Sequence, residues 1–152
     1  MANFLEGQEL RTLHLGTRVT KSTGTLAATT VPLFTIGVGE CLVTSLYGLV
    51  TTSITVANSY KLVMNPTTGD TQDFCAATDI GTTDTLAGSI LQFGLATTTA
   101  PAKLISVGYG TARLNTAVPV GQIESVSAGT DGVILWCLTY IPLSDGATIV
   151  AA

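Results

Sequence analysis

The sequence predicts an all-β fold, a single-domain β-sandwich or jelly-roll of about nine or ten short strands with an extended N-terminal arm. Short runs of β-branched and apolar residues recur at spacings of roughly 8 to 12 residues, with turn residues between them. The sequence shows no internal repeat and no convincing amphipathic helical pattern. Its 152 residues are enough for one domain with a substantial core.

The first 25 residues are expected to precede the main domain, which spans 26–152. Residues 1–10 have no hydrophobic period, which is typical of an arm. Residues 12–20 alternate weakly, with Leu13 and Leu15 on one face, and predict a first weak strand. The Ser, Thr, Gly and Ala residues of 21–30 predict an extended loop that docks on another subunit.

The middle of the chain has the clearest strand pattern. After a short strand at 31–36, two runs flank Gly48 and are rich in Val, Ile and Thr. They predict either one long strand with a bulge at Gly48 or two strands that meet at a corner. A short helix competes within 72–80, where we favour strand or irregular structure. Further strands are predicted over 60–64, 85–93, 104–107, 117–120, 122–127 and 148–150.

The run from Gly132 to Pro142 contains the only Trp and predicts a buried strand. Side chains alternate between the two faces of a strand. One face therefore holds Ile134, Trp136, Leu138 and Tyr140, and the other holds Val133, Leu135, Cys137, Thr139 and Ile141. Because both faces are mostly apolar, we expect the domain's own core to cover one of them. A second sheet or a neighbouring subunit would cover the other.

The composition predicts an assembling subunit. Hydrophobic residues make up 46% of the chain and charged residues only 11%, with a mean hydropathy of +0.51. Ordinary soluble domains carry about 25% charged residues. A membrane span would explain the difference, but every apolar stretch is interrupted before about 20 residues. Glutamates and Arg11 near the start also argue against a signal peptide. We therefore expect much of the outer surface to be buried against copies of the chain or a partner.

Several classes of site are disfavoured. A net charge of −4 and six scattered basic residues argue against nucleic-acid binding. Three widely spaced cysteines predict reduced, buried thiols made in a reducing cytoplasm. His14 is the only histidine, so neither a histidine metal cluster nor a catalytic triad is indicated. We predict no enzymatic activity, no metal and no cofactor.

Two further groups of residues have a structural and a functional interpretation. Asp70, Asp73, Asp79 and Asp84 lie in one loop-rich region but do not match a calcium-binding loop. We interpret them as solvated carboxylates, with a structural ion as the lesser alternative. Trp136 and the tyrosines would suit a sugar-binding platform if they were exposed, whereas a Trp in an apolar strand is more often part of a core.

Three segments together resemble small virion proteins of tailed bacteriophages. They are residues 43–52, residues 61–69 with Asp73-Phe74-Cys75, and residues 136–147, and the resemblance extends from about residue 26 to the end. It implies a head decoration or cement protein: a β-sandwich that oligomerises, often as a trimer, on the outside of the lattice of major capsid protein. Such a protein is made in the bacterial cytoplasm and is located in the virion.

We expect the N-terminal arm and one apolar face of the strand at 132–142 to make the subunit or capsid contacts. The candidate residues are Phe4, Leu5, Leu13, Val133, Leu135 and Ile141. Two other classes stay open. One is a tail, neck or baseplate adaptor, and the other is a carbohydrate-binding module of a host-recognition structure. The major capsid protein and further copies of the chain are the expected partners, with no nucleic acid and no membrane.

Overall fold

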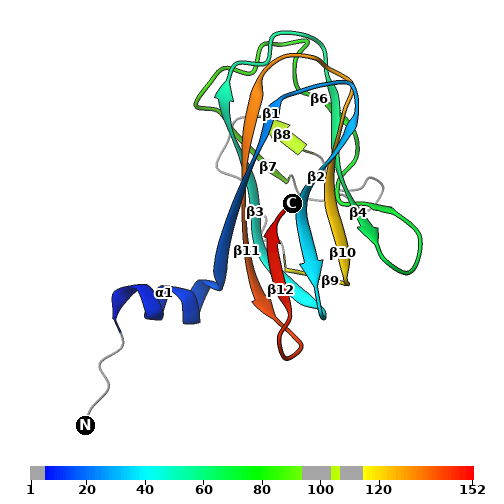
Figure 1. The fold of residues 1–152 in the computed structure, drawn as a ribbon. Helices are drawn as coiled ribbons and strands as arrows, with labels where there is room; N and C mark the ends of the chain where they lie inside the picture. The colour runs from blue at the N-terminus through cyan, green and yellow to red at the C-terminus, as the bar shows by residue number, and fades with distance from the viewer. Residues whose placement is uncertain (1–5, 94–103, 107–114) are drawn as a thin grey trace, which may run out of the picture.

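The computed structural model describes residues 6–93, 104–106 and 115–152. These residues form a single domain of two antiparallel sheets packed face to face, which confirms the predicted all-β sandwich (Figure 1). The elements are α1 (Gly7–Leu15), β1 (Thr17–Thr25), β2 (Thr30–Gly37), β3 (Cys41–Thr52), β4 (Ser59–Pro66), β5 (Gln72–Asp73), β6 (Thr78–Asp79), β7 (Ile90–Phe93), β8 (Leu104–Ser106), β9 (Thr116–Val118), β10 (Gly121–Ser127), β11 (Val133–Pro142) and β12 (Thr148–Ala151).

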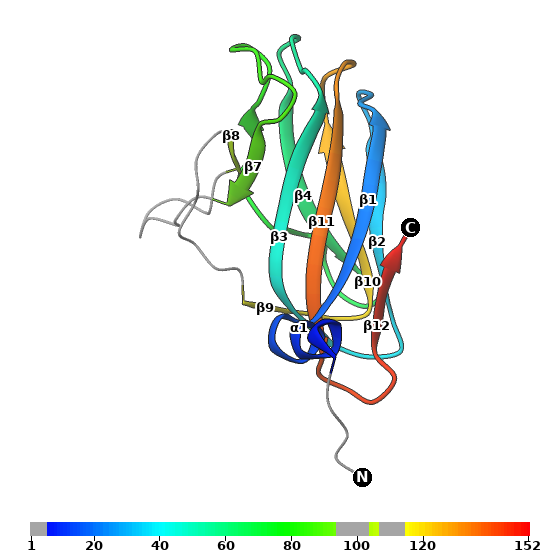
Figure 2. The ribbon, with the colours of Figure 1, turned by 90° about the vertical axis from the view of Figure 1, so that its left-hand side faces the viewer.

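The first sheet, here called sheet 1, has the strand order β1–β11–β3–β7–β8, and β9 also pairs with β3. The second, sheet 2, has the order β12–β2–β10–β4–β5, and β6 also pairs with β4. Figure 2 looks onto the outer face of sheet 1, with β11 between β3 and β1. The strand predicted over 132–142 is therefore an interior strand of its sheet, with a neighbour on each side, as its long apolar run requires.

The core lies between the sheets and is built from alternate residues of the central strands. On β11, the predicted inward face is confirmed, because Ile134, Trp136 and Leu138 are fully buried. Trp136 stacks on Tyr60 of β4, with ring centroids 6.2 Å apart and an angle of 8° between the planes. Its Nε1–H also donates to the Tyr60 hydroxyl at 2.9 Å, so one residue pair joins the two sheets.

Gly48 lies within a continuous β3, and the register with β11 runs through it without a bulge. It is directly opposite Trp136. A Cβ at this position would lie 2.8 Å from Cγ2 of Ile134 and 3.3 Å from the indole ring. The glycine therefore makes room for the bulky side chains of β11, which explains an isolated glycine in an otherwise β-branched strand.

The N-terminal prediction was wrong in one respect, because residues 7–15 form an α-helix rather than an unpatterned arm and part of a strand. The Glu9 carboxylate accepts a hydrogen bond from the Glu6 N–H at 2.9 Å, which supports the first turn. Leu13 and Leu15 alternate with polar residues over too few positions to distinguish a strand from a helix end. β1 then begins at Thr17 and continues to Thr25, through half of the segment predicted as a loop.

The described residues contain twelve strands, more than the nine or ten predicted. The excess comes from β5 and β6, two-residue strands along β4 in the region predicted to be strand or irregular. Two predicted strands are shorter than expected. The run to Val56 leaves the sheet after Thr52, and the run from Thr85 joins it only at Ile90.

Candidate subunit interface

The outer face of sheet 1 carries an apolar surface that its own chain leaves partly uncovered. Residues paired across an antiparallel sheet share a face. Leu135 of β11 is paired with Leu49 of β3, and Leu49 is paired with Ile90 of β7. At the other end of β11, Ile141 is paired with Leu42. With Val133, these residues form what we call the outer stripe: Leu42, Leu49, Ile90, Val133, Leu135 and Ile141, all half-buried or exposed.

Arg18 belongs to β1, the edge strand next to β11, and lies beside the outer stripe. Its Nη2 donates to the sulfur of Cys137 at 3.3 Å and to the Tyr47 hydroxyl at 3.4 Å. Its side chain therefore reaches across β11 towards β3, and this explains why Cys137 is only 2% exposed although it points outward. No carboxylate within the described ranges pairs with Arg18. The outer face of sheet 1 thus presents a guanidinium group without a counter-charge.

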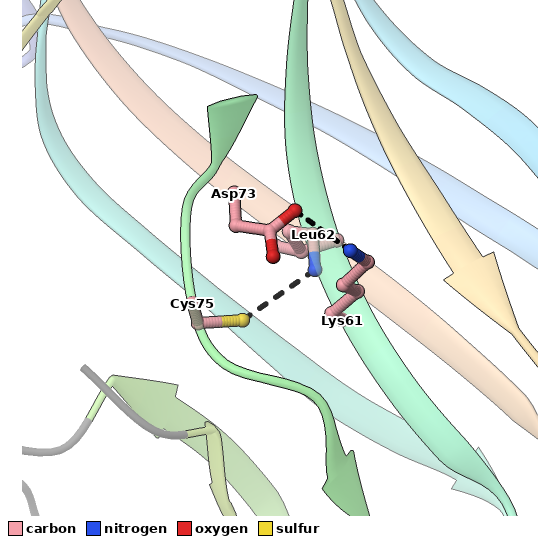
Figure 3. Close-up of polar contacts among 4 residues, drawn as sticks. All are labelled: Lys61, Leu62, Asp73 and Cys75. Carbon is pink, nitrogen blue, oxygen red and sulfur yellow. Dashed lines mark hydrogen bonds and ion pairs between the residues drawn. The ribbon is translucent and has the colours of Figure 1, made fainter. Parts of the chain in front are cut away.

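The outer face of sheet 2 is mixed: Val126 and Val150 point outward among paired polar groups. Asn65 donates from Nδ2 to Glu124 Oε1 at 3.2 Å across neighbouring strands. The Lys61 ammonium and the Asp73 carboxylate form an ion pair at 2.7 Å, with side chains 30% and 50% exposed (Figure 3). An exposed pair of this kind contributes about 0–1 kcal/mol, so it is compatible with a solvated surface. The two faces of the sandwich therefore differ in character.

The same close-up shows how β5 and the segment after it are attached to β4. The Cys75 sulfur accepts a hydrogen bond from the Leu62 N–H at 3.4 Å (Figure 3). Burial raises the pKa of the Cys75 thiol, which disfavours the reactive thiolate. Cys41, Cys75 and Cys137 are all free and buried, as the sequence predicted. Cys75 therefore acts as a packing group at the edge of sheet 2.

Helix α1 projects from the sandwich and exposes leucines. Figures 1 and 2 together show that α1 leaves the lower end of sheet 1 and points away from its outer face. Leu10, Leu13 and Leu15 are 52%, 70% and 55% exposed. Leu10 and Leu13 are three positions apart, so they share a helix face, and Glu6 and Glu9 lie on that face as well. The helix thus presents two leucines with two carboxylates on their N-terminal side.

The start of β1 fixes the direction of this helix. Gly16 has a φ of +92°, and a Cβ there would lie 2.3 Å from the Tyr140 carbonyl oxygen. Only glycine allows the chain to turn so close to β11. The Thr44 hydroxyl also donates to the Leu15 carbonyl at 3.0 Å. The helix is therefore attached to sheet 1 at one defined point, with its leucines uncovered.

The structure brings together only some of the contact residues predicted from the sequence. Val133 and Leu135 lie on the outer face as predicted, and Ile141 is 37% exposed beside them. Leu13 belongs to α1 and not to a strand. Phe4 and Leu5 lie outside the described residues. Sequence reasoning missed Arg18, Tyr47, Leu42, Leu49 and Ile90, because the partners of a strand and hence its neighbours on one face cannot be read from its own alternation.

Two of the four acidic residues singled out in the sequence, Asp79 and Asp73, have structural partners. Asp79 accepts backbone N–H groups from Asn58, Gly81 and Thr82 at 2.9–3.1 Å, and the Thr82 hydroxyl also donates to it. These bonds hold the pKa of Asp79 well below its ordinary value. Asp73 pairs with Lys61. In the part of the chain that the structure describes, no group of three His, Cys, Asp or Glu residues is placed to hold a metal ion.

Two grooves lie where the sheets meet at one end. One, of about 330 Å³, is lined by residues of β4, β5 and β9 and by Phe74 and Pro119, which follow β5 and β9. The other, of about 370 Å³, is lined by loop residues that include Glu40, Thr67 and Ser144. Neither groove has a Cys, His, Lys or Arg side chain among its described lining residues. Trp136 and Tyr60 are fully buried, so neither offers a stacking platform for a sugar.

No family model matches the chain, and no curated protein or solved structure is significantly similar to it. None of the described helices is long and apolar enough to cross a membrane.

Proposed function

We propose that this protein is a non-enzymatic assembly subunit, and specifically a decoration or cement protein of a tailed-bacteriophage head. In this proposal the sandwich binds the outside of the major capsid lattice and other copies of itself, and so resists the pressure of the packaged DNA. The phage assignment rests on the sequence resemblance alone. The more general assignment, an assembly subunit, rests on the surface of the domain.

The observation that carries the proposal is the contrast between the two outer faces. Sheet 2 faces outward with paired polar groups such as Asn65 and Glu124, whereas sheet 1 presents the outer stripe beside Arg18. Contiguous apolar surface with a polar rim is typical of protein interfaces, and Arg and Tyr are enriched in their centres. Because only 11% of its residues are charged, the chain has few charged side chains to solvate such an apolar face.

The experiment that tests the phage assignment is a copy-number measurement. The polypeptide is quantified by mass spectrometry in the purified particle that carries it, relative to the major capsid protein. A simple fraction of the capsid copy number supports a lattice-bound decoration protein. A few copies per particle would assign the protein to the tail, neck or baseplate, and its absence from particles would reject a virion role.

A carbohydrate-binding module is the weaker candidate, because its test requires exposed aromatic rings. Trp136 is fully buried and hydrogen-bonded to Tyr60. Iodide should therefore leave Trp136 fluorescence nearly unquenched in the folded protein. Strong quenching by iodide or by sugars would return this candidate to consideration.

A further inference from the structure

We propose that α1 of one copy binds the outer face of sheet 1 of a second copy, with Leu10 and Leu13 on the outer stripe and Glu6 and Glu9 facing Arg18. This inference deepens the proposed assembly function and rests on it for its biological setting. The chain leaves both the leucines of α1 and the outer stripe partly uncovered, and in this arrangement the two surfaces of neighbouring copies cover each other.

Helix α1 is short enough to need a packing surface for its stability. An isolated helix shorter than about 12–15 residues is marginal in water, and its stability in proteins comes mostly from packing one apolar face. α1 has nine residues, and the turn at Gly16 and the hydrogen bond to the Leu15 carbonyl attach it to the sandwich. Leu10 and Leu13 are 52% and 70% exposed. A partner surface would supply the missing packing.

The helix α1 and the outer face of sheet 1 carry complementary charges and apolar residues. The helix places Glu6 and Glu9 on the N-terminal side of its two leucines, and the face places Arg18 beside its apolar residues. No described cation pairs with either glutamate, and no described carboxylate pairs with Arg18. The Glu9 carboxylate that accepts the Glu6 N–H keeps a second oxygen for a guanidinium group. Opposite charges on the two surfaces would fix the direction of the helix on the face.

The length and direction of α1 suit the outer stripe of a second copy. A nine-residue helix is about 14 Å long, and the stretch of β11 from Leu135 to Ile141 spans about 20 Å, so the helix fits on the stripe. α1 points away from the outer face of its own sheet, so it cannot lie on that face without a break at Gly16 (Figure 2). A second copy that receives the helix is therefore turned relative to the first. Head-to-tail contacts of this kind form a ring where the rotations close, and an open helical filament where they do not.

The test uses two variants of the full chain. Leu10→Lys with Leu13→Lys disables the helix and keeps the face, whereas Leu135→Lys disables the face and keeps the helix. We expect the wild type to be an oligomer by light scattering, and each variant alone to have the mass of one chain, 15.6 kDa. Mixed in equal amounts, the two variants should form a species of twice that mass, because one intact helix meets one intact face.

Each of the other outcomes overturns the inference. If the faces pair with one another, the helix variant stays oligomeric and the mixture shows no rescue. If the wild type is a single chain at micromolar concentration, no contact between copies exists. Circular dichroism and thermal melts establish that both variants fold, since all three substituted residues are at the surface. Arg18→Glu should weaken assembly at least tenfold while Arg18→Lys retains it, and equal assembly of the two would remove the charge argument.

Failure of this test is distinct from failure of the proposed function. A monomer that is nevertheless found on particles at a simple fraction of the capsid copy number would retain the decoration role and reject the exchange of helices. An oligomer with successful rescue that is absent from particles would retain the exchange and reject the virion role.

Discussion

Replacing Asn58 with Ala should destabilise the sandwich strongly, because this side chain connects two loops inside the domain. Asn58 is fully buried. Its Oδ1 accepts the N–H groups of Gly129 at 2.9 Å and Ala128 at 3.0 Å, and its Nδ2 donates to the Ser127 hydroxyl at 3.0 Å. These bonds hold the turn between β10 and β11 against the segment that follows β3. Alanine would leave the Gly129 N–H buried without a partner.

The expected cost follows from the groups left unpaired. A buried donor or acceptor without a partner costs about 1–3 kcal/mol, and Asn58→Ala orphans the Gly129 N–H fully and the Ser127 hydroxyl partly. We expect a loss of about 3 kcal/mol in the free energy of unfolding. With a urea m-value of about 2 kcal/mol/M, the midpoint would fall by about 1.5 M.

Asn65→Ala is the matched control for this measurement. Asn65 is exposed on sheet 2 and donates to Glu124, so its removal should change the free energy by no more than about 0.5 kcal/mol. Urea unfolding followed by tryptophan fluorescence reports both values, because Trp136 leaves the core on unfolding. Equal midpoints for the two variants would refute the role given to Asn58.

Three further predictions concern the core, the pH dependence and the thiols. Trp136→Phe removes the donor to the buried Tyr60 hydroxyl and should cost about 2 kcal/mol in urea unfolding; a loss below about 0.5 kcal/mol would contradict that pairing. The native pKa of Asp79 lies below its ordinary 3.8, so the unfolded chain takes up the proton first as pH falls. The stabilisation from Asp79 is therefore present at neutral pH and lost in acid, and Asp79→Asn should flatten the fall in melting temperature below about pH 4; an unchanged acid limb would contradict this. The thiols of Cys41 and Cys75 should react with a disulfide reagent only in denaturant, because both are buried and burial raises their pKa values; fast labelling of the native protein would show that the core opens.

The sandwich itself could be predicted because period-two alternation and turn residues are local properties of the chain. The alternation of β11 followed directly from the sequence, and the structure places Ile134, Trp136 and Leu138 on its inward face. The helix α1 was missed, because its amphipathic face has only Leu10 and Leu13 and its start depends on the Glu9 carboxylate. A helix this short gives a weak sequence pattern.

The candidate interface could be predicted only in part, for a reason of topology. Leu135 and Val133 were identified because they share a strand with the core residues. Leu49 and Ile90 become their neighbours only through the pairing of β11 with β3 and of β3 with β7. Strand order is set by contacts distant in sequence, so one strand's pattern does not contain it. Arg18 was likewise recognisable as part of the face only once β1 was paired with β11.

The central claim is that the outer face of sheet 1, and not that of sheet 2, makes the contacts between subunits. Two half-buried valines allow a matched test, since Val133 points outward on β11 and Val126 points outward on β10. The solution mass of Val133→Lys and Val126→Lys is measured by light scattering beside the wild type. The account predicts that Val133→Lys alone falls to the mass of one chain, while Val126→Lys keeps the wild-type mass. A folded Val133→Lys that still assembles, or a Val126→Lys that does not, would contradict it.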